Sequence, residues 1–164
     1  MKTVLIPTDF SLESTKIIDA LVNAQPDEKL NIIFFHAFKL SDSITDMLML
    51  SRRSRDYENV SDTFYQKLND IKQQYPSVER IGIEYFYGST VYAFKNFIEN
   101  LAISYIAYPK DYQFKTINKY SIDPQLLTSR CGCQVLALNI LSLHHQENLI
   151  DTKIEERKLA AVNA

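Results

Sequence analysis

Glycine and cysteine are both scarce in this chain of 164 residues, which contains 3 glycines and 2 cysteines. Loops that hold phosphate groups with bare backbone need several glycines, because glycine alone lets the main chain approach a ligand so closely. The sequence also contains no Walker loop, no Gly-x-Gly-x-x-Gly fingerprint and no Gly-x-Ser-x-Gly elbow. The common motifs of phosphate binding and of serine hydrolysis are therefore missing.

The two cysteines, Cys131 and Cys133, are too few for a disulfide framework. A zinc site at this pair would need further ligands, and the neighbouring sequence supplies none. We therefore expect two small residues packed before a strand, no metal site, and a protein of the reducing cytoplasm.

Strong charge and long apolar runs are also lacking. The net charge of -2 disfavours a protein that coats nucleic acid or binds a membrane surface. No apolar run is long enough to span a bilayer, and the first residues do not resemble a secretory signal. We expect no nucleic-acid partner and no membrane partner.

What the chain does contain is an alternation of short apolar runs and amphipathic segments, with 46% hydrophobic residues overall. This alternation predicts an α/β fold, a Rossmann-like three-layer sandwich with a five-stranded parallel sheet. Residues 1–140 would form one domain, and residues 141–164 a charged tail with room for one helix. The predicted strands are residues 3–7, 30–38, 81–87, 103–108 and 133–140, and the predicted helices are residues 12–24, 57–75, 89–101 and 123–131.

Residues 41–56 fit two interpretations. They could form a surface connection with solvated arginines, or a lid that folds over a site at the end of the second strand. We favour the surface connection.

The most informative stretch is the opening one, from Thr3 to Ser11. A buried strand ends at Pro7, which lacks a backbone donor, and Ser11 is a suitable cap for the helix that follows. Asp9 then lies at the carboxyl end of the strand, where open α/β sheets bind ligands. Asp9 could also be a turn former that accepts backbone amides. His36, within the second strand, is expected to be a buried, hydrogen-bonded residue, and no catalytic residue is nominated.

Several segments together resemble the universal stress protein family, over residues 1–139. The resemblance implies strand order 3-2-1-4-5 and a homodimer joined along the last strand. The segments that carry it are Val4-Leu5-Ile6-Pro7-Thr8-Asp9-Phe10-Ser11, Phe35-His36-Ala37, Tyr87-Gly88 and Cys131-Gly132-Cys133-Gln134-Val135-Leu136.

Many members of that family bind ATP or AMP. The resemblance implies that Asp9 meets the ribose and adenine end of the nucleotide and that the backbone near Ala37 reads adenine. The phosphates would rest on a loop of the form Gly-x2-Gly-x9-Gly-Ser/Thr after the fourth strand. The candidate ligand-binding residues are Pro7, Thr8, Asp9, Ala37, Lys110 and Ser121.

This sequence departs from that glycine loop at every glycine. Pro109 and Tyr112 take the first two glycine positions, Ser121 takes the third, and the loop is one residue short. Pro109 has no N–H to donate to a phosphate, and the Tyr112 ring stands where bare backbone should approach. Lys110, Lys115 and Lys119 could compensate as point charges, although solvated lysines on a loop are the favoured interpretation.

We therefore expect a dimeric stress-response protein of the universal stress type that is not an enzyme and has no cofactor. It would act as a regulatory or binding protein toward a partner protein or a small-molecule ligand, with ATP binding weak or absent. One alternative is an AMP or ATP sensor that uses Asp9. Another is an enzyme of the nucleotide-binding α/β group, which no motif supports.

Overall fold

A computed structural model of the chain describes residues 1–39 and 60–141. The predictions for residues 41–56 and for the tail beyond residue 141 lie outside these described residues. The helices and strands are β1 (Lys2–Pro7), the 3₁₀ turn η1 (Glu13–Lys16), α1 (Ile17–Ala24), β2 (Leu30–Phe38), α3 (Asp62–Gln74), β3 (Val78–Tyr87), α4 (Val91–Asn100), β4 (Tyr105–Pro109), α5 (Gln125–Thr128) and β5 (Val135–Leu138).

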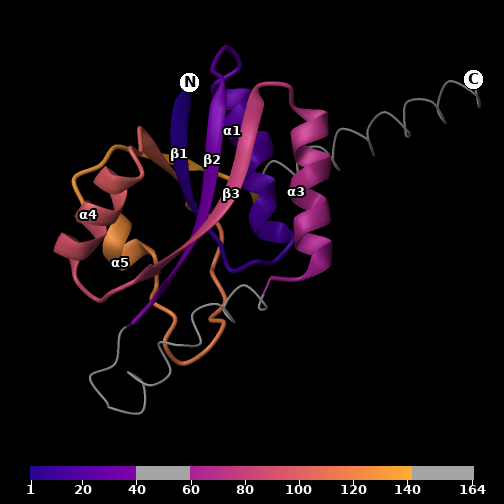
Figure 1. Cartoon of the computed structure of the whole chain (residues 1–164). Helices are drawn as coiled ribbons and strands as arrows, with labels where there is room; N and C mark the ends of the chain where they lie inside the picture. The colour runs from indigo at the N-terminus through magenta and orange to yellow at the C-terminus, as the bar shows by residue number, and fades with distance from the viewer. Residues whose placement is uncertain (40–59, 142–164) are drawn as a thin grey trace, which may run out of the picture.

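The five strands form one parallel sheet with the order β3-β2-β1-β4-β5. Helices α1 and α3 lie on one side of this sheet and α4 and α5 on the other (Figure 1). The predicted fold class and strand order are thereby confirmed. β3 lies at one edge of the sheet, which is consistent with its partly exposed, alternating sequence.

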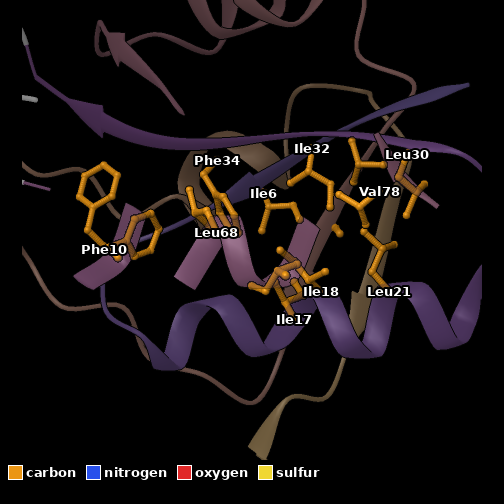
Figure 2. Packing of buried hydrophobic residues seen from close by; sticks show 14 of the residues in the cluster. Ile6, Phe10, Ile17, Ile18, Leu21, Leu30, Ile32, Phe34, Leu68 and Val78 are labelled. Atoms are coloured by element: carbon orange, nitrogen blue, oxygen red, sulfur yellow. The ribbon is translucent and has the colours of Figure 1, made fainter. Parts of the chain in front are cut away.

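Apolar side chains from alternate positions of the strands form two cores, one on each face of the sheet. On the first face, Ile6 and Ile32 point toward Ile17, Ile18 and Leu21 of α1 (Figure 2). All five side chains are fully buried, and each such burial stabilises the fold by about 1.5–3 kcal/mol. This packing explains why β1 has a continuous apolar sequence and why it lies at the centre of the sheet.

Hydroxyl side chains cap the N-termini of α3 and α4. Ser61 caps α3 by accepting a hydrogen bond from the backbone N–H of Phe64. The cap of α4 is Thr90, which accepts from the N–H of Ala93, one residue after Ser89, where the predicted helix begins. A threonine next to a serine offers an equally suitable oxygen, and the geometry of the turn selects between them.

The sheet brings the first strand beside the fourth. The connection after β1 leads to β2 on one side of β1, whereas β4 lies on the other side and its connection leads outward to β5. The connections after β1 and β4 therefore leave in opposite directions. In open α/β sheets this arrangement leaves a crevice at the carboxyl ends of the strands, where ligands bind.

Candidate functional site

A cleft of about 330 Å³ lies at this point, which is at the lower end of the size of small-molecule sites. The ends of β1 and β2 form its floor, and the segments after β4 and before α5 form its walls. The lining residues are Pro7, Thr8, Phe35, His36, Ala37, Tyr108, Tyr112, Gln113, Phe114, Lys115, Thr116, Ser121, Ile122, Asp123, Pro124 and Gln125.

Asp9 is held by four donors from the chain itself. One carboxylate oxygen accepts from the hydroxyl of Ser11 at 2.6 Å and from its backbone N–H at 3.1 Å. The other oxygen accepts from the Tyr112 hydroxyl at 2.6 Å and from the backbone N–H of Lys115 at 3.0 Å. The carboxylate therefore fastens the wall of the cleft to the end of β1.

These contacts shift the pKa values of both Asp9 and Tyr112. Partial burial raises the pKa of Asp9, but the hydrogen bonds from Ser11, Tyr112 and the Lys115 backbone outweigh it and hold that pKa below its ordinary value. Burial and the bond to Asp9 raise the pKa of Tyr112 to about 12. At neutral pH Asp9 is thus an anion and Tyr112 a neutral donor.

Thr8 and Phe10 shape the turn that carries Asp9. Phe10 has a φ of 62°, a left-handed conformation that side chains other than glycine adopt at an energetic cost. Its N–H donates to the Thr8 hydroxyl at 3.0 Å, and its ring packs edge-on against Phe64 at 5.6 Å between centroids. The buried ring holds the backbone in this bend.

His36 and Ser121 meet inside the cleft, although 85 residues separate them in sequence. His36 Nδ1 lies 2.8 Å from the carbonyl oxygen of Thr8, and Nε2 lies 2.8 Å from the Ser121 hydroxyl. The Ser121 oxygen also accepts from the backbone N–H of Ile117 at 2.9 Å. His36 is 6% exposed, so it is the buried, hydrogen-bonded histidine that its place in an apolar strand predicted.

The end of β2 is also paired with the cleft wall. Phe38 and Ser121 form an antiparallel bridge, and the N–H of Ile122 donates to the carbonyl of Ala37 at 2.9 Å. The resemblance assigns adenine recognition to the backbone near Ala37, and the carbonyl of this residue is already bonded within the chain.

Comparison with solved structures relates this arrangement to known proteins. A hypothetical protein, PH0823, is 17% identical in sequence, with 85% of this chain and 96% of that chain covered and a TM-score of 0.55. The universal stress protein UspA from Lactobacillus plantarum is 13% identical, with 84% and 97% covered and a TM-score of 0.54. A protein of the universal stress protein family from Burkholderia pseudomallei is 11% identical, with 84% and 95% covered and a TM-score of 0.50.

This is the universal stress protein fold. It spans the described sheet and the helices on both of its faces. No family model matches the sequence, and no curated protein is significantly similar to it.

Within this universal stress protein fold, the predicted site residues divide into two groups. Pro7, Thr8, Ala37 and Ser121 line the cleft. Asp9 and Lys110 are not among the described residues that line it. Asp9 accepts hydrogen bonds from Tyr112 and Lys115, which do line the cleft, and Lys110 is exposed after β4.

The residues that local sequence reasoning missed are the aromatic ones. Phe114 packs edge-on against Tyr112 at 5.2 Å and against Tyr108 at 5.9 Å between ring centroids. Burial and the nearby charge of Asp123 raise the pKa of Tyr108 to about 12, so its phenol stays neutral. The abundance of aromatic residues after β4 was the available signal, and it falls where the glycine loop was expected.

The described residues contain no cluster of three or more side chains suited to hold a metal ion. Cys131 is buried and Cys133 is half-buried, and both are free thiols. None of the helices in residues 1–39 and 60–141 has the length and apolar character needed to cross a bilayer.

Proposed function

We propose that this protein is a regulatory or binding protein of the universal stress type, acting in stress adaptation without a bound triphosphate and without nucleotide turnover. The observation that carries the proposal is the internal occupation of the nucleotide positions. The resemblance assigns Asp9 and the backbone near Ala37 to the nucleoside, and the Asp9 carboxylate and the Ala37 carbonyl are bonded by Tyr112, Lys115 and Ile122 of the same chain.

A nucleoside that used Asp9 would have to displace these donors. Hydrogen bonds to a charged group contribute about 1.5–3 kcal/mol each to stability, and Asp9 accepts four of them. A ribose hydroxyl would replace one or two of these bonds and leave the others broken. Binding through Asp9 would therefore gain little over the ligand-free state.

The phosphate end is equally unfavourable. Pro109 belongs to β4 and has no N–H to donate, and the Tyr112 ring lies in the cleft wall. Lys115 brings one positive charge to the lining, but the carboxylate of Asp123 lies in the same lining and would repel a polyphosphate. The cleft is better suited to a small ligand of low net charge that packs against Tyr108 and Phe114.

Titration calorimetry with ATP and AMP, each with and without Mg²⁺, tests this proposal. We expect no saturable binding of either nucleotide up to about 1 mM. A dissociation constant of about 1 mM corresponds to a binding free energy of about -4 kcal/mol. Tight, magnesium-dependent ATP binding would contradict the proposal.

The alternative, a nucleotide sensor, makes a different prediction. It requires that AMP or ATP raise the melting temperature and that Asp9→Ala abolish the increase. Thr3→Ala is a matched control, because Thr3 lies in β1 and is not among the cleft residues.

A further inference from the structure

The proposed binding role leaves one pair of cleft residues unused. His36 and Ser121 both line the cleft, and their side chains are within hydrogen-bond distance, at 2.8 Å. Neither residue is needed to explain why a triphosphate would be excluded.

The hydrogen bonds determine where the protons lie. The Thr8 carbonyl can only accept, so His36 Nδ1, at 2.8 Å from it, carries a proton. In the neutral ring Nε2 is then an acceptor, and the Ser121 hydroxyl donates to it.

The remaining contacts of the Ser121 oxygen agree with this assignment. The backbone N–H groups of Ile117 and Asn118 donate to it at 2.9 and 3.4 Å. A serine hydroxyl has one proton to donate and two lone pairs to accept with. The proton is thus directed to His36 and one lone pair to the Ile117 N–H. The second lone pair, which has only the long contact with Asn118, is left to attack a carbonyl carbon.

This is the arrangement of an activated serine nucleophile. A hydroxyl contacts a histidine acceptor, and a third group orients the histidine from its other nitrogen. The orienting group here is the Thr8 carbonyl in place of a carboxylate.

We propose that Ser121 accepts an acyl group from small activated esters that enter the cleft. His36 Nε2 takes the hydroxyl proton while Ser121 Oγ forms a bond to the ester carbonyl carbon. The bond from that carbon to the leaving oxygen then breaks, and His36 returns the proton to the departing alcohol or phenol. The products are acyl-Ser121 and one free alcohol, and no oxidant, metal or nucleotide is required.

The lining limits the donor to a small, largely uncharged ester. The volume is about 330 Å³, and the aromatic rings of Tyr108 and Phe114 favour a flat leaving group such as a phenol. Gln113, Lys115 and Gln125, whose side chains are of a type that can donate to an oxyanion, are among the lining residues.

The experiment incubates the full chain with p-nitrophenyl acetate and measures phenolate release together with peptide mapping by mass spectrometry. We expect release of about one phenolate per chain in a burst, and an acetyl group on the peptide that contains Ser121. Ser121→Ala should lose both signals. Ser129→Ala is the matched control, because Ser129 is exposed on the adjacent segment and its hydroxyl donates to a backbone carbonyl.

His36→Gln separates base catalysis from support of the fold. A glutamine amide can still donate to Thr8 and accept from Ser121, but it cannot take a proton. We expect this variant to melt near the wild-type temperature and to acylate at least 100-fold more slowly. Acylation of wild type should also fall at acid pH, where imidazole is protonated.

Three outcomes would overturn the proposal. They are the absence of an acetyl group on Ser121 in the folded wild-type protein, acylation of His36→Gln at the wild-type rate, and acetyl groups confined to lysines such as Lys115. Should Ser121→Ala fail to fold, the His36→Gln rate and the pH profile of the wild type decide the question. None of these outcomes depends on whether nucleotides bind.

Discussion

At the scale of single residues, the Tyr112 hydroxyl occupies one oxygen of the Asp9 carboxylate. Its bond of 2.6 Å to the carboxylate fastens the cleft wall to the end of β1. We predict that Tyr112→Phe lowers the free energy of unfolding by about 1–2 kcal/mol in urea denaturation, since a bond to a charged acceptor is lost. Tyr92→Phe is the control, because Tyr92 is 76% exposed. Equal stability of Tyr112→Phe and wild type would mean that this bond does not hold the loop.

The ionisation of Asp9 predicts a dependence of stability on pH. The pKa of Asp9 is lowered in the folded state from its ordinary 3.8, so the unfolded chain binds the proton more readily. The stabilisation is complete above this ordinary pKa and is lost as the pH falls through the folded-state value. Urea unfolding on both sides of pH 3.8 should show this loss in wild type and a weaker loss in Asp9→Asn. An identical acid profile for the two proteins would contradict the assignment.

At single residues, only contacts between positions close together in the chain could be predicted from the sequence. The turn-forming role of Asp9 was one of two stated interpretations, and the Ser11 N–H bond shows that turn directly. The partners Tyr112 and Lys115 lie 103 and 106 residues away. No spacing rule connects groups that only the folding of the sheet brings together, and the His36–Ser121 pair was missed for the same reason.

At the scale of the elements, two glycines give a matched test of backbone conformation. Gly132 has a φ of +75° before β5, whereas Gly82 lies within β3, and a Cβ added at either position would contact nothing within 4 Å. We predict that Gly132→Ala lowers the melting temperature, with a cost of about 1 kcal/mol for the left-handed conformation. Gly82→Ala should leave stability unchanged or raise it by up to about 1 kcal/mol. Equal effects of the two substitutions would mean that a side chain at position 132 does not strain the backbone.

The elements themselves were well predicted where one signal dominated. The second strand was predicted at 30–38 and is Leu30–Phe38, because a long apolar run leaves little choice. The last strand was predicted at 133–140 but is only Val135–Leu138. Its length is set by its pairing with Ile106–Pro109 of β4, and a strand's partner is not visible in its own sequence.

At the scale of the whole molecule, β5 is an edge strand that pairs only with β4 among the described residues. The carbonyls of Gln134 and Leu138 accept from the N–H groups of Ile106 and Lys110, so the main-chain groups of Val135 and Ala137 point away from β4. Val135 is 40% exposed. An open apolar edge is prone to association, and a homodimer through this strand remains our prediction.

Light scattering with size exclusion tests this dimer at micromolar concentration. We expect a dimer for wild type and a monomer for Ala137→Pro, which removes an outward N–H without touching the bonds to β4. Ala137→Ser keeps that N–H and should remain a dimer. A monomeric wild-type protein would refute the prediction.

The fold class could be predicted because alternating strands and helices admit few topologies. The strand order followed from the family resemblance and is confirmed by the sheet. The shape of the cleft could not be predicted, since it depends on a loop whose contacts all lie far away in sequence.

The antiparallel bridge at the end of β2 gives the mouth of the cleft a rigid rim. The amide hydrogens of Lys39 and Ile122 are bonded across it at 2.8 and 2.9 Å, so deuterium should enter these two positions as slowly as it enters the sheet interior. A ligand would enter an opening whose shape is already fixed by these bonds. Selectivity among ligands would then depend on how well each fits that shape, and little on a conformational change of the protein.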